Sequence, residues 1–237
     1  MIDCHYRRLA ADGEFLVFES TDGARSNSDP EIQHGSPPLA LMTKLIEERA
    51  GLIEERAGDS GLRIGRLTLD ILGAIPVTRL RLRSWVERPG ARVAARDQRH
   101  CRRVTDRHPP LVEGDSVAVP HSWEGAKGYL ETVSWRRQHG ADGDASVVWL
   151  SPLVPLVDSE PTTELQRLAM VVDSANGAGA ALDPEKFVFM NTDTVMHLHR
   201  LPAGNDPPWR SPTTPGSGTP RCSPTPLPRV PARPAPM

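Results

Sequence analysis

Two side chains able to handle a water molecule lie 18 residues apart in the segment 165–200. Asp173 follows an amphipathic stretch, and Asn191 stands in a run in which polar and apolar residues alternate. A carboxylate can act as a general base, and an amide can accept and donate hydrogen bonds that orient a water molecule. A second interpretation stays open, in which Asp173 only marks a helix that frays into a loop and Asn191 is an ordinary polar strand residue.

Three histidines and a glutamine are further candidates for chemistry. His197 and His199 share one strand face at a spacing that lets two imidazoles reach one metal ion. No third ligand lies close in the sequence, so we expect packing within the sheet and no metal site. His34 stands just before a helix start, where a general base could lie. Gln166 precedes Asp173 by two helical turns on the same stripe, and we interpret it as a helix-surface residue. None of these patterns indicates a cofactor.

Two periodicities in the segment 165–200 must position these side chains. Apolar residues at the spacing i, i+3, i+4 and i+7 predict a helix with one buried face: Leu165, Leu168, Ala169 and Val172. Ser159 or Thr162 is the expected N-cap of this helix. From Phe187 the period changes to two, which predicts a strand with Asn191 on one face and Thr194 on the other. Together, the two periodicities imply a helix that is wrapped by the strand following it in the sequence.

An earlier helix contains an identical tandem repeat. Ser36 can cap this helix, and Pro37 and Pro38 suit its first positions because they lack N–H groups that would be unpaired there. The heptapeptide LIEERAG then occurs at 45–51 and again at 52–58. Seven residues are about two helical turns, so the second copy keeps the apolar register. We therefore predict a helix that continues to about Gly58.

Short alternating runs predict strands around these helices. In the first half they are residues 13–20, 63–72 and 78–87, and the last two are joined by a turn around Gly73 and Pro76. Leu67, Leu69 and Ile71 should form the buried face of the second run. In the second half, the runs 129–137 and 145–154 are separated by the turn sequence HGADGD. Each half therefore supplies strands and one long helix.

Two segments interrupt this pattern. Residues 94–108 are basic and unpatterned where further strands are expected. An exposed loop and a phosphate-binding patch are both compatible with their charge, and we favour a local frame disturbance in the coding sequence. After Arg200 the composition changes, and residues 202–237 hold half of the 24 prolines. Proline lacks the donor that a central strand needs, so this tail should form no sheet, and a second frameshift near Gly204 would explain it.

Composition limits the classes of function. The 237 residues are 38% hydrophobic, enough for a buried core, and a net charge of −2 gives no reason to expect a nucleic acid or an anionic membrane as partner. No run reaches the roughly 18 to 20 apolar residues of a membrane span, and the N-terminus lacks the apolar region of a signal peptide, so we expect a cytoplasmic protein. The three cysteines are widely spaced and indicate neither a disulfide framework nor a thiolate metal site.

Several motifs resemble the acyl-CoA thioesterase II family. They are QHGSPPLAL and RLTLDILGAIPV in the first half, and LQRL, VVDSANG, ALDP and NTDTVMHLHR in the second. The resemblance implies an α+β double hotdog, in which two long helices are each wrapped by a curved antiparallel sheet, here with an incomplete second sheet. The implied division is an N-terminal hotdog at 1–105, a linker at 106–122, a truncated C-terminal hotdog at 123–203 and a Pro-rich disordered tail at 204–237.

The resemblance also implies an activity, the hydrolysis of fatty acyl-CoA to free fatty acid and CoA. The family holds the attacking water with a carboxylate, a hydroxyl residue and a glutamine. Asp173 matches the carboxylate, Asn191 stands where the hydroxyl residue is expected, and the glutamine belongs to a late strand with no counterpart in this sequence. Backbone N–H groups near a helix start would stabilise the oxyanion. The implied partner is acyl-CoA; a homo-oligomer is compatible with the family, but its size does not follow from the sequence.

Two other classes of function remain open. Without the glutamine and the hydroxyl residue, hydrolysis should be slow, and the chain could be a catalytically impaired acyl-CoA-binding or structural hotdog protein. The tail sequence PTPLPRVPARP resembles polyproline ligands of SH3-type domains, although such motifs also arise freely in out-of-frame, GC-rich coding sequence. A tail that pairs with nothing would leave an unprotected strand edge next to Met196 and Leu198, and the isolated protein should then be prone to aggregation.

Overall fold

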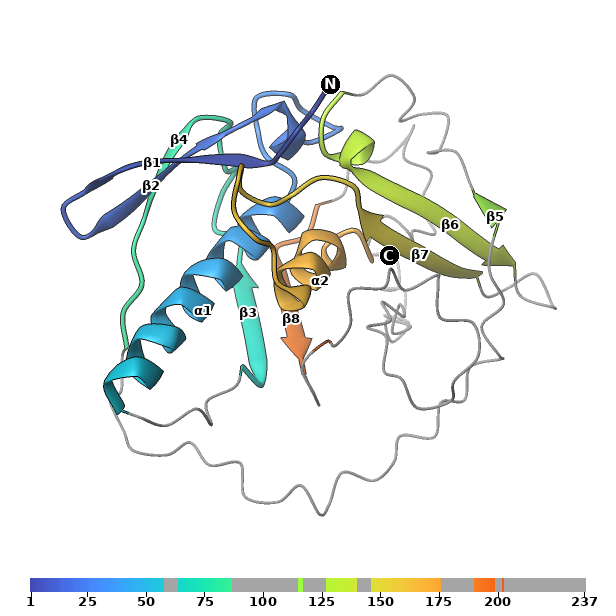
Figure 1. The fold of residues 1–237 in the computed structure, drawn as a ribbon. Coiled ribbons are helices and arrows are strands. Elements are labelled where there is room, and N and C mark those ends of the chain that lie inside the picture. Colours follow the sequence, from blue (N-terminus) through green and yellow to red (C-terminus); the bar gives the residue numbers. More distant parts are fainter. Residues whose placement is uncertain are drawn as a thin grey trace, which may run out of the picture.

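The computed structural model describes residues 1–57, 64–86, 115–116, 127–139, 146–175, 190–198 and 202 (Figure 1). The predictions made for the segments 94–108 and 204–237, for Phe187, for His199 and for the turn after residue 139 lie outside these residues. Within the described ranges, the chain folds into two α-helices, short 3-10 helices and antiparallel sheets.

Helix α1 (Ser36–Ala57) runs through both copies of the tandem repeat. The prediction of a helix that continues to about Gly58 is therefore confirmed. The role predicted for Ser36 is wrong. Ser36 is itself the first helical residue, and its buried Oγ has no hydrogen-bond partner among the described residues, so it does not cap the helix.

Helix α2 (Glu164–Val172) is shorter, and its predicted apolar face is confirmed: Leu165 and Ala169 are buried, and Leu168 and Val172 pack partly buried against the core. The N-cap is Thr163, whose Oγ1 accepts a hydrogen bond from the N–H of Gln166 at 3.2 Å. Neither Ser159 nor Thr162 fills this role. The Thr162 hydroxyl instead accepts a hydrogen bond from the N–H of Leu156, which fixes the segment that leads into α2.

The two helices pack side by side in antiparallel directions (Figure 1). The start of α1 lies against the end of α2, where Gly35 touches the Asp173 carboxylate. At the other end, the Glu47 carboxylate of α1 accepts hydrogen bonds from the side chains of Thr163 and Gln166. Each end of the helix pair therefore contains a carboxylate in contact with the opposite helix.

The described strands form three small antiparallel sheets. The first contains β1 (Tyr6–Asp12), β2 (Phe15–Ser20) and β4 (Arg79–Leu82), in the order β1-β2-β4. The second pairs β3 (Arg66–Asp70) with β8 (Asp193–His197), and the third contains β5 (Asp115–Ser116), β6 (Val133–His139) and β7 (Ser146–Pro152). The short 3-10 helices are η1 (Asp22–Ala24) and η4 (Tyr129–Thr132).

Most of the predicted strands are present, with three differences. The sequence does not predict β1, whose residues show no clear alternation of buried and exposed positions. The run at 129–137 begins as η4, so its strand starts only at Val133. The runs that form β3 and β4 follow each other in the chain but pair with different strands, β3 with β8 and β4 with β2.

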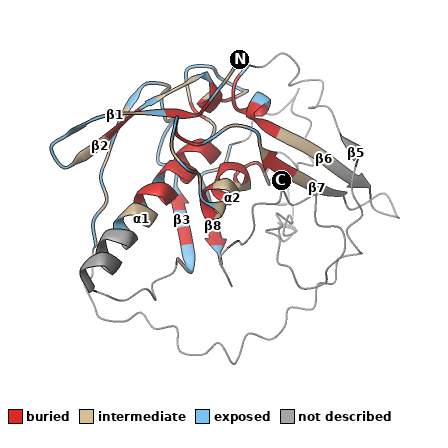
Figure 2. Ribbon diagram, in the orientation of Figure 1, coloured by how far each residue is buried: buried red, intermediate tan, exposed pale blue. Residues whose placement is uncertain are grey.

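The β3–β8 pair connects the two halves of the chain. Leu67 lies opposite Met196, and Leu69 lies opposite Thr194, so the buried face of β3 meets the inward face of β8. Figure 2 shows buried residues along α2, β3, β8 and the first half of α1, which together form the core beside the helix pair. Within residues 190–198, the alternation predicted from Phe187 is present in Asp193–His197, and Asn191 precedes this strand and does not share its register.

The architecture is thus a mixed α/β fold with two packed helices and several antiparallel sheets. The complete double hotdog and the domain boundaries drawn from it stay predictions. No helix in the described part of the chain is long and apolar enough to cross a membrane.

Candidate functional site

The site is built around Asp173, which ends α2 and is 8% exposed. Its Oδ1 accepts two hydrogen bonds, one from Asn191 Nδ2 and one from Thr194 Oγ1, both at 2.8 Å. Asn191 Nδ2 also donates to the backbone carbonyl of Asp173 at 2.9 Å. The predicted pair Asp173 and Asn191 is therefore in direct contact, and Thr194 adds a hydroxyl that was not among the predicted site residues.

Asn191 and Thr194 reach the same carboxylate because the strand begins between them. Thr194 lies on the inward face of β8, in the same register as the buried Met196. Asn191 lies before the first strand residue, so the alternation of the strand does not turn its side chain away. A hydroxyl on the inward face of the strand, two residues before the apolar Met196, was the signal that could have identified Thr194.

On its other side, the Asp173 carboxylate lies against Gly35 and His34. A β-carbon at Gly35 would collide with Asp173 Oδ2, so this position has no room for a side chain. His34 Nδ1 is 3.9 Å from Asp173 Oδ2, and the His34 ring stacks on Tyr129 with centroids 3.9 Å apart. Together, Gly35 and His34 hold the segment before α1 against the end of α2.

His34 is a neutral neighbour of Asp173. Burial lowers the pKa of His34 to about 4, and the charge of Asp173 only partly opposes this effect. The backbone N–H of Ser36 donates to His34 Nδ1 at 3.2 Å, so this nitrogen carries no proton. His34 therefore does not pair with Asp173 as a cation, and its Nδ1 lone pair is already engaged. The general base that the sequence suggested at His34 is not supported by this geometry.

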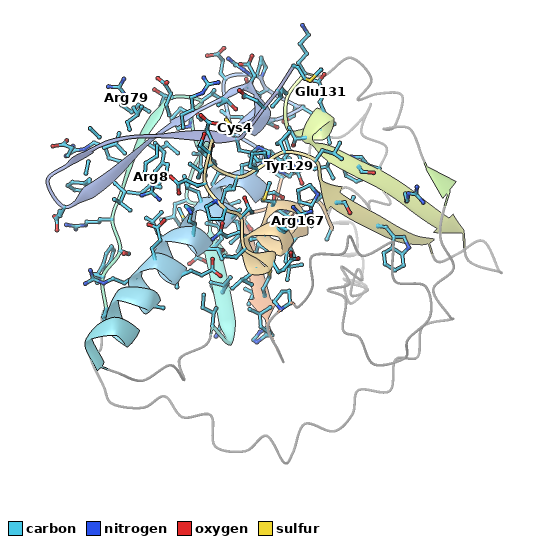
Figure 3. All side chains as sticks on the ribbon, in the orientation of Figure 1. Cys4, Arg8, Arg79, Tyr129, Glu131 and Arg167 are labelled. Carbon is cyan, nitrogen blue, oxygen red and sulfur yellow. The ribbon has the colours of Figure 1, made fainter. Side chains whose placement is uncertain are left out.

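Tyr129, the first residue of η4, holds the end of α2 in place. Its hydroxyl donates to the backbone carbonyl of Met170 at 2.9 Å and lies 2.7 Å from the hydroxyl of Ser174. Its backbone N–H bonds to the carbonyl of Arg25 at 3.0 Å. Figure 3 shows Tyr129 beside α2. These contacts hold the turn on which Asp173 lies.

Gln33 anchors the segment that carries His34 and Gly35. Its Oε1 accepts from the Tyr6 hydroxyl at 2.6 Å, its Nε2 donates to the carbonyl of Pro76 at 2.7 Å, and it is buried. The three residues of the QHG sequence thus have separate tasks. Gln33 fixes the loop, His34 stacks on Tyr129, and Gly35 makes room for Asp173.

The start of α1 offers few backbone donors for an oxyanion. Pro37 and Pro38 have no N–H. The N–H of Ser36 is bonded to His34, and that of Leu39 is bonded to the carbonyl of Gly35 at 3.1 Å. Within the described residues, the N–H of Gly35 is the remaining backbone donor without an acceptor here. We expected several backbone N–H donors near the helix start, and the described residues leave one, the N–H of Gly35.

The other polar candidates lie away from Asp173. Gln166 is 3% exposed and donates to Glu47 Oε2 at 2.6 Å, so its interpretation as a surface residue is wrong: it is buried between the two helices. It precedes Asp173 by two turns of α2, a distance of about 10 Å. His197 is exposed on the outward face of β8. Among the described residues, no group of three potential ligands could hold a metal ion.

Comparison with known families agrees with the motifs. The model of the acyl-CoA thioesterase N-terminal domain matches residues 24–109, which include His34 and Gly35. The model of the acyl-CoA thioesterase C-terminal domain matches residues 90–214, which include Asp173, Asn191 and Thr194 and make up more than half of the 237 residues. No curated protein and no solved structure gives a significant match. The chain belongs to the acyl-CoA thioesterase family.

Proposed function

We propose that this protein hydrolyses fatty acyl-CoA thioesters to free fatty acid and CoA, with Asp173 as the general base. The observation that carries the proposal is the environment of the Asp173 carboxylate. The carboxylate is buried, Asn191 and Thr194 orient it through hydrogen bonds, and the neighbouring His34 is neutral. A carboxylate that is fixed but not neutralised by a cation can accept a proton from a bound water.

The two carboxylate oxygens have different tasks in this proposal. Oδ1 accepts both side-chain hydrogen bonds, whereas Oδ2 faces Gly35 and His34. Oδ2 is therefore the oxygen that takes the proton from water. Both Asn191 N–H bonds are used on Asp173, which leaves the Asn191 amide oxygen to accept a hydrogen bond from the same water. The partly exposed side of the site, formed by His34, Asn191 and Thr194, is the side from which a thioester would approach.

The reaction then proceeds in two steps. Water attacks the thioester carbonyl carbon while Asp173 Oδ2 accepts its proton, which gives a tetrahedral oxyanion. The oxyanion collapses, the carbon–sulfur bond breaks, and the CoA thiolate takes the proton back from Asp173. The products are a free fatty acid and CoA. We expect turnover to be slow, because the glutamine that helps to hold the water in the family has no counterpart here.

The test is release of the CoA thiol from acyl-CoA substrates of increasing chain length. Asp173→Asn should lower kcat by at least 100-fold with little change in unfolding temperature, because the amide fills the same space but cannot take the proton. Asp193→Asn is the matched control, since Asp193 is an exposed carboxylate on β8 close to the site, and it should leave kcat unchanged. Acyl-CoA binding without any turnover by the wild-type protein would favour the catalytically impaired binding protein instead.

A further inference from the structure

The buried hydroxyl of Ser36 has no hydrogen-bond partner among the described residues. Ser36 is the first residue of α1 and is 0% exposed, and its Oγ neither donates nor accepts a hydrogen bond there. A buried polar group without a partner destabilises a folded protein, so natural structures rarely keep one without a use. The role of this hydroxyl is not to cap α1, as shown above.

The position of Ser36 on α1 indicates where its side chain points. An α-helix turns about 100° per residue, so Ala40, Thr43 and Glu47 each lie within about 40° of Ser36, on one stripe of the helix. Glu47 contacts Thr163 and Gln166 on α2, so this stripe faces α2. Because the helices are antiparallel, Ser36 faces the end of α2, where Asp173 lies. The contact of Asp173 with the neighbouring Gly35 agrees with this direction.

The proposed reaction needs a hydrogen-bond donor for the thioester carbonyl oxygen near the start of α1. A thioester carbonyl placed for attack by water on Asp173 would have its oxygen near the start of α1, where a positive helix end favours negative charge. The backbone supplies little there, since Pro37 and Pro38 lack N–H groups and the N–H of Ser36 is already bonded to His34. Gly35 contributes one N–H, and a second donor must come from a side chain.

We propose that the Ser36 hydroxyl is that second donor: it donates a hydrogen bond to the thioester carbonyl oxygen and holds it as it becomes an oxyanion. This assignment rests on the proposed function. Ser36 keeps its proton throughout, and the attacking oxygen comes from water. Ser36 does not serve as a nucleophile, because its hydroxyl has no hydrogen bond to a base among the described residues and His34 Nδ1 accepts the backbone N–H of Ser36 instead.

The first experiment compares Ser36→Ala with the wild type. We expect kcat to fall about 100- to 1,000-fold with a much smaller change in KM, the size found when one oxyanion donor is removed. The unfolding temperature should stay equal or rise, because the variant removes an unpaired buried polar group. Thr43→Val is the matched control on the same stripe: the Thr43 hydroxyl bonds to the Leu39 carbonyl at 2.8 Å, and its loss should leave kcat unchanged. A Ser36→Ala variant that unfolds easily would mean that the hydroxyl is structural, and would overturn the proposal.

The second experiment measures binding without turnover, using two acyl-CoA analogues. In one, CH2 replaces the sulfur, so that the carbonyl is kept as a ketone; in the other, the carbonyl is removed and a thioether remains. Ser36→Ala should weaken binding of the ketone about 5- to 50-fold and leave binding of the thioether unchanged. Equal affinities of variant and wild type for the ketone would overturn the role of Ser36 while leaving the proposed function intact. A wild-type protein that binds neither analogue and hydrolyses no acyl-CoA would overturn both.

Discussion

The two ends of the α1–α2 pair hold their carboxylates in different ways. At the far end, Arg8 Nε lies 2.6 Å from Glu160, Arg8 also lies 2.6 Å from Glu48, and Lys44 Nζ lies 2.9 Å from Glu160. Figure 3 shows Arg8 beside α1. At the near end, Asp173 is held by the neutral side chains of Asn191 and Thr194. Glu48 and Glu160 are thus paired with two cations, whereas Glu47 at the far end and Asp173 at the near end accept hydrogen bonds from neutral side chains.

In the proposed function, this difference separates the ion-paired cluster of Glu48 and Glu160 from Asp173, the proposed general base. Burial pushes the pKa of Glu160 up, but hydrogen bonds and charge from Arg8 and Lys44 outweigh it, so the pKa lies below its usual value. A carboxylate bound in this way is a poor proton acceptor. The Asp173 carboxylate is oriented by hydrogen bonds, but no cation among the described side chains pairs with it. A carboxylate in this state can act as a general base. Four changes test this contrast.

The largest effect is expected at the near end, from Gly35→Ala. The new methyl group would collide with the Asp173 carboxylate and push it away from Asn191 and Thr194. Catalysis depends on placement to within about 1 Å, so kcat should fall at least 100-fold. Gly65→Ala is the control, because no atom lies near a β-carbon at that position. Full activity in Gly35→Ala would show that the observed position of Asp173 is not the productive one.

The next effect belongs to the far end. Arg8→Met should lower the free energy of unfolding by about 2 kcal/mol, because it leaves Glu48 and Glu160 with less compensation in a half-buried cluster. Urea unfolding measures this change, and kcat should stay within twofold of wild type. Arg7→Met on the same strand is the control: its pair with Asp3 is exposed and screened by solvent, so the free energy of unfolding should stay at the wild-type value. A large loss of kcat in Arg8→Met would abolish the division between the two ends.

Thr194→Val should have a moderate effect on activity alone. The substitution keeps the shape of the side chain and removes the donor to Asp173 Oδ1, while Asn191 still holds the carboxylate. We expect kcat to fall about 10-fold, as for loss of one of two orienting hydrogen bonds. Thr192→Val, at an exposed neighbouring position, should behave as wild type. If both variants match the wild type, Asn191 alone orients the base.

The last change tests the pH dependence of stability. Burial lowers the pKa of both His34 and His5 to about 4, so between pH 6.5 and pH 4 the unfolded chain binds protons that the folded chain does not. Stability is therefore fully present above pH 6.5 and is lost as the pH falls through this window, by roughly 1 kcal/mol per pH unit for each imidazole. Unfolding in urea at pH 7 and pH 5 should show a smaller loss for His34→Asn than for wild type. His197→Asn, which changes an exposed ring, should show the wild-type loss, and an equal loss in all three proteins would mean that His34 is accessible to protons in the folded state.

Local patterns in the sequence were sufficient to predict the helices. The face formed by Leu165 and Ala169 and the continuation of α1 through the tandem repeat follow from a period of 3.6 residues, which each segment contains by itself. The buried residues Leu67 and Leu69 of β3 follow from a period of two in the same way. The contact between Asp173 and Asn191 was expected from the family motifs.

Other features depend on contacts between distant segments. No local signal specifies that β3 pairs with β8, because register is set by which buried faces meet in the folded core. The burial of Gln166 depends on Glu47, which lies 119 positions away in the chain. That Gly35 has no room for a side chain is evident only when the folded chain places the Asp173 carboxylate against it. Thr194 could not be separated from other polar residues before the start of β8 was known.

The pairing of β3 with β8 also determines when the protein can fold. Asp70 of β3 lies opposite Asp193 of β8, so more than 120 residues must be synthesised between the two partners. Contacts this far apart slow folding, since the chain loses the entropy of a long loop before the sheet gains its hydrogen bonds. Until β8 emerges from the ribosome, Leu67 and Leu69 lack their cover and Asp173 lacks both of its donors. The end that carries the proposed general base is therefore among the last parts to be completed, and a nascent chain that stops before residue 190 would contain both described α-helices but no assembled site.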